Sequence, residues 1–408
     1  MEIACLFVGW SPPFSFIEAK ANNRVVLCCF ARLDESGFLK TDVNSEFLIA
    51  IELNSMRFLV IQQKMIGDVL TSTIICDNLK IKYPDCVIDY VVNEQTVGVI
   101  ENHPSIDHII VFKKDYRKKK ELYRFLKIIG KVKYDAVIDA YCKIESNLIS
   151  LFANSPRKIS MRKWYSRWVY DLTYVRFSEP DPQMRLAIKN RLQLLEPFGL
   201  SEHRIVTQPS IFISEDEKEQ ASNFLSINNI EDNSKLIMVS VLGSSKSKSY
   251  PDLFMARMID QVCEELVNPI VLFNYIPSQK QQAQKVYELC NAGSKSCIRF
   301  DVFARSMRDF LAVLKQCKVL IGNEGGAVNM AKALGIPTLC VFAPMTDKAG
   351  WSSNSEKNHI AIHLEDFYPE LFKDKAKSTM AKRNVAYYNL LEPKLFKAKL
   401  TRFLDEHV

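Results

Sequence analysis

The segment GNEGGAVNMAKALGIPTLCVFAP (322–344) is the part of this sequence that says most about the fold. It leads from the end of a predicted strand, through Gly325 and Gly326, into a predicted helix that Gly335 closes. A second apolar strand follows at once. Strand, glycine turn, helix and strand in that order are typical of a parallel α/β sheet. Such a helix start offers free backbone N–H groups and the positive end of the helix dipole, so it favours an anionic ligand such as pyrophosphate.

The same alternation of short apolar runs and helical stretches continues on both sides of this segment. In the second half, strands are predicted at 235–242, 269–273, 318–322 and 337–342, and helices at 252–266, 278–290 and 306–316. In the first half, strands are predicted at 57–62, 86–92, 108–112 and 135–140, and helices at 69–82 and 119–131. Near-continuous apolar strands separated by helices imply parallel sheets covered on both faces. The predicted fold is therefore α/β, with two doubly wound, Rossmann-like domains facing a central cleft.

This pattern divides the chain into three parts, 1–55, 56–233 and 234–408. The first part shows no sustained period, and we interpret it as a dispensable extension or the product of an upstream start codon. The second part forms the first domain and ends in a less regular connector (164–233) with one helix near 184–198. The third part forms the second domain, and its closing helix, about 392–406, is expected to cross back onto the first.

Length and composition fit a globular enzyme. Of the 408 residues, 48% are apolar and 25% charged, which is ordinary for such proteins. No apolar run reaches the roughly eighteen residues that a membrane span requires, and no secretory signal pattern is present. The eleven cysteines are scattered without a C-x-x-C pair, which favours reduced thiols over zinc binding or disulfides. We therefore expect a cytoplasmic protein.

Basic residues are concentrated in one window of the chain. Between Lys113 and Arg167 there are sixteen Lys and Arg but only five Asp and Glu, a balance of +11 against +7 for the whole chain. Such a surface attracts phosphates, whether on nucleic acid, a membrane face or an anionic glycolipid. The alternative is a merely solvated face. The residues taken as acceptor-binding candidates are Lys118, Lys119, Lys120, Arg162 and Lys163.

The first candidate site is QQKMIGDVL (62–70), directly after the first strand. Gly67 is expected to relieve a tight turn, and Asp68 occupies the place of a helix N-cap. Asp68 either only caps the helix or turns its carboxylate toward the cleft as a general base.

The second candidate site is VLGSSKSKSYP (241–251), after the first strand of the second domain. The hydroxyls of Ser244 and Ser245 can donate to phosphate oxygens, and Lys248 adds a compact positive charge. The alternative is a flexible surface loop, but a position at a strand's carboxyl end favours a functional role.

These motifs together resemble the heptosyltransferases of glycosyltransferase family 9, over about residues 56–350. The resemblance rests on the Gly-Asp turn with the later pair Tyr83–Pro84, on Lys248 followed by Tyr250 and Pro251, and on 322–344. It implies a GT-B fold, with Asp68 as catalytic base and Lys248 assisting the leaving diphosphate. The donor-binding residues that it implies are Ser244, Ser245, Gln279, Asn323, Glu324, Gly325, Gly326 and Asn329.

Three positions depart from the family pattern. Glu324 stands where the family has Asp, Asn329 where it has His, and Gln279 where an acidic residue often holds the ribose. These departures leave the fold prediction unchanged but bear on the identity of the donor.

The resemblance implies an inverting transfer of heptose from ADP-heptose to the lipopolysaccharide inner core. It implies peripheral contact with the inner membrane face and no nucleic-acid partner. No cofactor is expected, and no metal, because the chain has no D-x-D motif. Two alternatives stay open: a nucleotide-sugar epimerase or hydrolase with the same cleft, and a non-catalytic protein that binds phosphate or nucleic acid through the basic window.

Overall fold

A computed structural model describes most of the chain. The described residues are 5–8, 14–21, 24–31, 51–52, 55–179, 181, 183–200, 205–231, 235–352, 358–372 and 377–408, with backbone only before 55 and at 377–382. The chain separates into two compact units, Met1–Met56 and Arg57–Val408. In the first unit, β1 (Cys5–Val8), β2 (Phe14–Ala21), β3 (Arg24–Ala31) and β4 (Ile51–Glu52) form an antiparallel sheet in that order. The interpretation of residues 1–55 as dispensable or mis-started lies largely outside the described residues.

The second unit begins with a six-stranded parallel sheet. Its strands are β5 (Arg57–Ile61), β6 (Val87–Asn93), β7 (His108–Phe112), β8 (Ala136–Asp139), β9 (Lys158–Met161) and β10 (Leu172–Tyr174). They lie in the order β10-β9-β8-β5-β6-β7, and every pairing is parallel. This is the strand order of dinucleotide-binding sheets. Four of the strands were predicted, whereas β9 and β10 are too short and too polar to stand out in the sequence.

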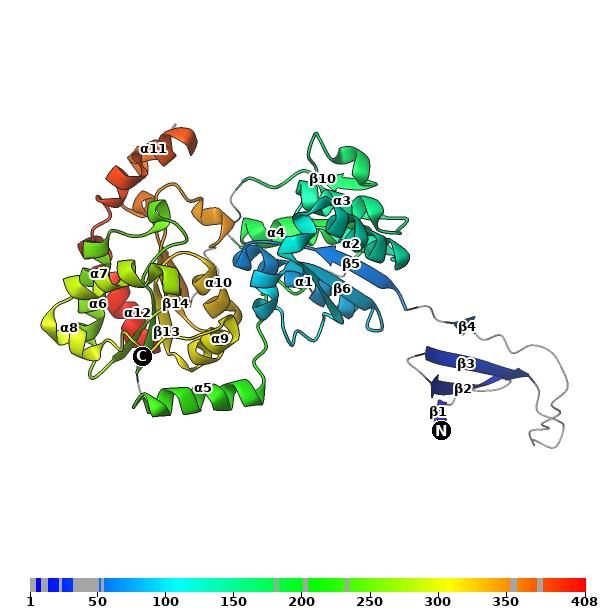
Figure 1. Ribbon diagram of the computed structural model, residues 1–408, viewed down its shortest axis with the longest axis horizontal. Helices are drawn as coiled ribbons and strands as arrows, with labels where there is room; N and C mark the ends of the chain where they lie inside the picture. Colours follow the sequence, from blue (N-terminus) through cyan, green and yellow to red (C-terminus); the bar gives the residue numbers. More distant parts are fainter. Residues whose placement is uncertain are drawn as a thin grey trace. The chain divides into compact units, whose positions relative to one another are not determined.

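Helices connect these strands (Figure 1). α1 (Ile66–Lys82), α2 (Lys119–Lys131) and α3 (Ile144–Phe152) lie between strands, and α4 (Leu186–Leu192) follows β10. In the connector, α5 (Glu215–Ile227) was not predicted because it has few apolar residues. A capping box at Ser214 and Glu217 starts α5, and α5 packs on α9 (Met307–Gln316) of the second half.

The second half contains a five-stranded parallel sheet. Its strands are β11 (Leu236–Ser240), β12 (Ile270–Phe273), β13 (Val319–Asn323), β14 (Thr338–Val341) and β15 (His359–Ile362). The order is β12-β11-β13-β14-β15, which is the other common doubly wound order. The helices are α6 (Asp252–Glu265), α7 (Lys280–Leu289), α8 (Ala292–Cys297), α9 (Met307–Gln316), α10 (Gly326–Ala333), α11 (Lys377–Tyr388) and α12 (Lys397–His407). The predicted α/β architecture with two doubly wound halves is confirmed.

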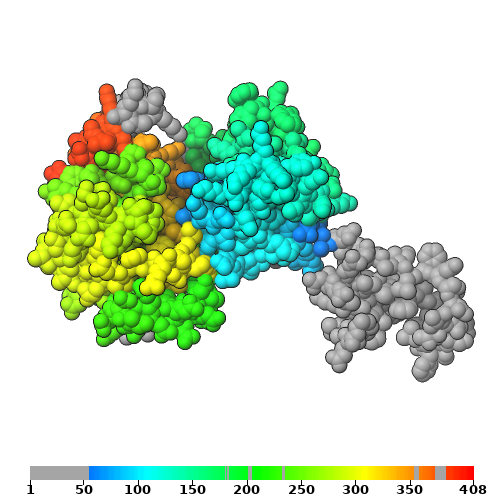
Figure 2. Space-filling model, in the orientation of Figure 1, coloured from blue at the N-terminus to red at the C-terminus, as the bar shows by residue number. Residues whose placement is uncertain are grey.

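The closing helix differs from its prediction. It starts at Lys397, and it packs on α6 of its own half instead of crossing back. Leu400, Phe403 and Leu404 explain this placement, because their buried side chains belong to the core of the second half. Figure 2 shows the two halves as lobes that touch. Among the described helices, none combines the length and the apolar character needed to cross a membrane.

Candidate functional site

The predicted motifs lie where the strand order of each sheet reverses. In the first sheet this switch point lies between β5 and β8, and in the second between β11 and β13. Loops leave neighbouring strands in opposite directions there, so a crevice opens outside the carboxyl ends of the strands. Asp68 follows β5, Ser244 follows β11 and Glu324 follows β13. The order of the strands therefore places each of the three motifs at the edge of its sheet where open α/β folds commonly bind ligands.

Asp68 is not the cap of its helix. The N-cap of α1 is Met65, with φ 67° and no side-chain cap bond, so Asp68 lies inside the first turn. Its Oδ1 accepts a hydrogen bond of 2.5 Å from Nη2 of Arg191, whose side chain is buried on α4. Arg191 is held in turn by Ser72, whose Oγ lies 3.2 Å from Nε. The interpretation of Asp68 as an N-cap is therefore wrong, because Met65 occupies that position and a buried arginine engages the Asp68 carboxylate.

A second arginine lies near the same carboxylate. Desolvation of its guanidinium and the charge of Arg191 lower the pKa of Arg176, and Asp68 opposes that shift. The residue as a whole remains exposed, so part of its surface is available to a ligand. Within the described part of the chain no hydrogen bond engages Oδ2 of Asp68, whose side chain is 29% exposed. One carboxylate oxygen is therefore anchored and the other is available.

Gly67 is needed for the approach of the two halves. A Cβ atom at Gly67 would lie 2.9 Å from Nδ2 of Asn329 and 3.2 Å from Cζ3 of Trp351. The expected turn at Gly67 is wrong, since the residue lies within α1 and the positive φ belongs to Met65. A Cβ at Gly326 would lie 3.4 Å from Cβ of Ile66. The starts of α1 and α10 thus meet, and Asp68 is brought beside the glycine pair of the second half.

A cavity of about 440 Å³ opens at the carboxyl ends of β11, β12 and β13. Five of the predicted donor-binding residues line it: Ser244, Gln279, Glu324, Gly325 and Gly326. Apolar side chains complete the wall, among them Tyr275, Phe303 and Met307. Ile66 of the first half also reaches the cavity. The cavity is polar where it meets the start of α10 and apolar elsewhere. It therefore suits a ligand that has one charged group and one flat, apolar group.

Glu324 is the carboxylate among the residues that line this cavity. Burial raises the pKa of Glu324, and the positive charges of Lys248 and Lys332 oppose that shift. Lys248 does not line the cavity itself, but its charge acts on Glu324. Nζ of Lys332 donates to the carbonyl of Trp351 at 3.2 Å. The cavity therefore holds a desolvated carboxylate with cations nearby, which is a typical setting for a functional group.

Asn323 has a structural role instead of facing the cavity. Its side chain is fully buried, and Oδ1 accepts a 2.6 Å bond from the backbone N–H of Tyr250. Nδ2 donates to the carbonyls of Ser240 and Val241 at 3.0 and 2.9 Å. Asn323 thus fastens β13 to the loop after β11. Asn329 is also turned away, since it is buried against Gly67 and Nδ2 donates to the Gly325 carbonyl.

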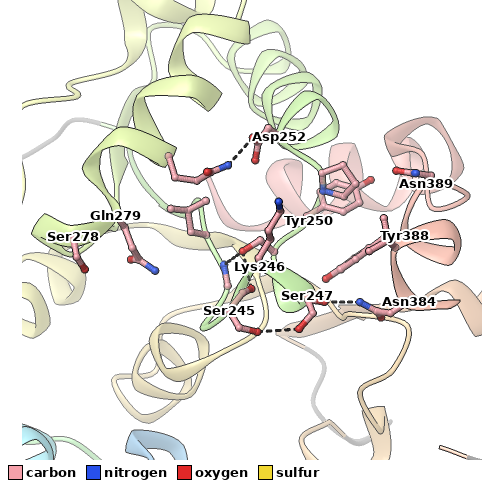
Figure 3. A pocket seen from close by; sticks show the side chains of 16 residues that line it. Ser245, Lys246, Ser247, Tyr250, Asp252, Ser278, Gln279, Asn384, Tyr388 and Asn389 are labelled. Atoms are coloured by element: carbon pink, nitrogen blue, oxygen red, sulfur yellow. Dashed lines mark hydrogen bonds between the residues drawn. The ribbon is translucent and has the colours of Figure 1, made fainter. Parts of the chain in front are cut away.

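The loop that carries Lys248 is held from α11, which the sequence did not reveal. Nδ2 of Asn384 donates to the Ser247 carbonyl at 2.5 Å (Figure 3), and the Tyr388 hydroxyl donates to the Lys248 carbonyl at 3.3 Å. Ser245 lies on this side of the loop, in a second pocket, with its Oγ bonded to Ser247. Ser245 is thus separated from Ser244, which faces the cavity.

The predicted acceptor-binding residues fall into two groups at the carboxyl edge of the first sheet. Lys118, Lys119 and Lys120 are exposed at the start of α2, after β7. Arg162 and Lys163 follow β9, four strand steps away, or roughly 19 Å. Among the described residues no group of three or more His, Cys, Asp or Glu could hold a metal ion.

Comparison with known proteins identifies the family. The family model of glycosyltransferase family 9 (heptosyltransferase) matches residues 122–378. Lipopolysaccharide heptosyltransferase 1 of Campylobacter coli is 21% identical over 70% of this chain and 84% of its own length.

Two solved structures show the same fold. The chain superposes on the family 9 glycosyltransferase from Veillonella parvula with a TM-score of 0.69, at 19% identity, covering 86% of this chain and 97% of that one. For the E. coli ADP-heptose lipopolysaccharide heptosyltransferase II the TM-score is 0.61 at 16% identity, covering 82% and 99%.

Proposed function

We propose that this chain, which belongs to glycosyltransferase family 9, transfers a heptose from ADP-heptose to the inner core of lipopolysaccharide. One observation carries most of the weight. The contact between Gly67 and Asn329 brings the start of α1, with Asp68, against the start of α10 beside the cavity. A base on one half and a diphosphate site on the other are the parts that a glycosyl transfer between two substrates requires.

The proposed reaction is a single inverting displacement. Oδ2 of Asp68 takes the proton of an acceptor hydroxyl, while Arg191 on Oδ1 fixes the orientation of the carboxylate. The hydroxyl oxygen forms a bond to the anomeric carbon as the bond from that carbon to the diphosphate breaks. A positioned base of this kind typically contributes about 10²–10⁴-fold to the rate.

The leaving nucleoside diphosphate carries the charge that develops. The backbone N–H groups at the start of α10, the hydroxyl of Ser244 and the ammonium of Lys248 are assigned to stabilise it. Tyr275, Phe303 and Met307 offer an apolar wall for the base of the nucleotide, and Gln279, which also lines the cavity, is assigned to the ribose. Glu324 is assigned to accept hydrogen bonds from the sugar.

The acceptor is proposed to approach from the first half. The inner core of lipopolysaccharide is rich in phosphate and carboxylate, which matches the excess of +11 between Lys113 and Arg167. Within that window, Lys118, Lys119, Lys120, Arg162 and Lys163 are the proposed contacts. Since that acceptor is attached to lipid, we place the enzyme in the cytoplasm, at the inner membrane face.

A panel of nucleotide sugars tests the assignment. The protein is incubated with ADP-heptose, UDP-hexoses or GDP-hexoses and core-truncated lipopolysaccharide, and the products are read by mass spectrometry. Asp68→Asn protein serves as the matched control for chemistry that does not depend on the site. We expect a heptose-sized increment from ADP-heptose alone, and a hexose-sized increment would contradict the donor assignment.

The same panel separates the two alternatives. Consumption of the donor without any acceptor would indicate an epimerase or a hydrolase. Binding of nucleic acid with a steep dependence on salt, together with no donor binding, would indicate a non-catalytic protein.

A further inference from the structure

Aromatic and basic side chains share one short loop of the first half. The sequence between β9 and β10 reads RKWYSRW at 162–168, and we call these residues the aromatic–basic loop. The exposed fractions of Trp164, Tyr165 and Trp168 are 87%, 38% and 70%. Trp is highly buried on average in folded proteins. Two exposed Trp residues on one loop therefore indicate a binding surface.

The loop is built to hold these rings outward. Nε1 of Trp168 donates to the Tyr165 carbonyl at 3.1 Å, and the rings of Trp164 and Tyr165 meet edge to face with centroids 5.6 Å apart. Ser166, which lies between Tyr165 and Trp168 in the sequence, is almost fully buried. Directly after the loop, the hydroxyl of Tyr170 donates to Asp139 on β8. The rings are thus ordered before any partner arrives, which lowers the entropic cost of binding.

The charge of the loop is entirely positive. Arg162, Lys163 and Arg167 are its charged residues, and the first acid after it is Asp171. The backbone N–H of Arg162 donates to the carbonyl of Tyr174 on β10, so Val175, which is 61% exposed, lies next to the loop. Exposed Trp and Tyr rings with Lys and Arg between them have the composition of protein surfaces at the boundary of lipid and water.

We propose that the aromatic–basic loop inserts into the surface of a bilayer that contains anionic lipid. The indole rings enter the boundary between headgroups and acyl chains, and the cations pair with lipid phosphates. The loop follows β9 at the carboxyl edge of the first sheet, the edge at which β5 leads to Asp68. Docking through this loop therefore turns the edge with Asp68 toward the membrane. This orientation deepens the proposed function, but lipid binding itself does not depend on it.

Flotation with lipid vesicles tests the proposal on the full chain without donor or acceptor. Vesicles of phosphatidylcholine are compared with vesicles that also contain phosphatidylglycerol. We expect binding to the anionic vesicles, with a blue shift of Trp emission. Trp164→Ser with Trp168→Ser should weaken binding roughly tenfold or more, from the apolar area lost. Arg162→Gln with Arg167→Gln should weaken it by about fivefold for each cation removed.

The matched control removes two exposed apolar side chains elsewhere. Ile227 and Val267 are 82% and 75% exposed on the connector and the second half, and changing both to Ser should leave vesicle binding intact. Equal binding by the Trp variant and the unchanged protein, or no binding to anionic vesicles at all, would overturn the proposal. A failed donor assignment would leave these outcomes unaffected.

Activity distinguishes a bilayer contact from a contact with the acceptor sugar. The Trp variant should retain transfer to a water-soluble, delipidated acceptor and lose it with the acceptor embedded in vesicles. Equal loss with both acceptors would show that the rings bind sugar, and would refute insertion into lipid.

Discussion

Asp68 follows the first strand of one sheet and Glu324 follows the third strand of the other, each at its switch point. Asp68 lies in the first turn of α1, and Glu324 comes just before the start of α10. The two helices meet between the halves. Asp68 has a buried arginine at 2.5 Å. Glu324 has no ion pair within the described part of the chain, and burial raises its pKa.

This difference separates two uses of a carboxylate. Arg191 comes from α4 in the connector, so Asp68 is oriented by a residue far along the chain and keeps Oδ2 for a proton. Glu324 is half-buried, burial raises its pKa, and the charges of Lys248 and Lys332 oppose that shift. A carboxylate in that state gains most from a ligand that donates hydrogen bonds. The first is suited to proton transfer, and the second to holding hydroxyl groups.

The largest effect is expected from Asp68→Asn. The amide keeps the shape of the side chain but cannot take a proton, so turnover should fall about a hundredfold or more while ADP binding is retained. Steady-state rates and calorimetry with ADP measure the two quantities. Asp77→Asn, on the same α1 and bonded to Ser105, is the control and should change turnover little. Transfer near the original rate would remove Asp68 from the chemistry.

The next effect concerns Lys248, whose positive charge opposes the rise in the pKa of Glu324. Lys248→Ala should lower ADP affinity and turnover together by about ten- to hundredfold, because hydrogen bonds to charged groups are worth roughly 1.5–3 kcal/mol. Lys246→Ala is a matched control, since Lys246 lies in the same turn but lines the second pocket. Equal losses from both variants would show a general effect of loop charge.

The sequence was sufficient for the repeated architecture and for the positions of the site loops. Continuous apolar strands such as β5 and β11 can be recognised from their residue types. Glycines mark positions where backbone or side chains approach closely. Gly322 is an example: its φ is 122° and a Cβ there would lie 2.4 Å from the Ser240 carbonyl. Apolar runs and glycines can be recognised in a single sequence, although the group that approaches each glycine cannot.

The partners of the site residues could not be predicted in this way. Arg191 lies 123 residues from Asp68, and Asn384 lies 137 from Ser247. Neither spacing follows from a period of the chain. The resemblance of the 322–344 segment implied that Asn323 faces the donor, yet its amide is fully used by backbone groups. Polar residues beside a motif can serve either the loop or the ligand, and only the packing decides.

A smaller effect is expected where the two helix starts touch. Gly67→Ala should favour α1 by up to about 1 kcal/mol, since Ala is the better helix residue. It should nevertheless reduce turnover by about five- to tenfold, because the new Cβ would lie 2.9 Å from Nδ2 of Asn329. Adding Asn329→Ala should restore part of the rate. A double-mutant cycle of rates and melting temperatures checks this, and independent effects of the two changes would disprove the contact.

The smallest effect, a few degrees in melting temperature, comes from the titration of Glu324. An ordinary Glu has a pKa of 4.5, and the folded protein raises that of Glu324. The folded state therefore binds its proton more tightly than the unfolded state, and stability is lost as the pH rises above 4.5. Glu324→Gln cannot titrate, so the variant should melt at a higher temperature at neutral pH, and this gain should shrink toward zero as the pH falls to 4.5.

Glu217 should show the opposite dependence of stability on pH in the same experiment. Its hydrogen bond from Arg308 lowers its pKa to about 2, so it contributes stability above pH 4.5 that is lost as the pH falls toward 2. Glu217→Gln should therefore melt at a lower temperature at neutral pH, and its deficit should shrink toward acid. Melting curves across pH for both variants measure the two slopes. Slopes of the same sign would mean that Glu324 is not desolvated, and its contrast with Asp68 would then disappear.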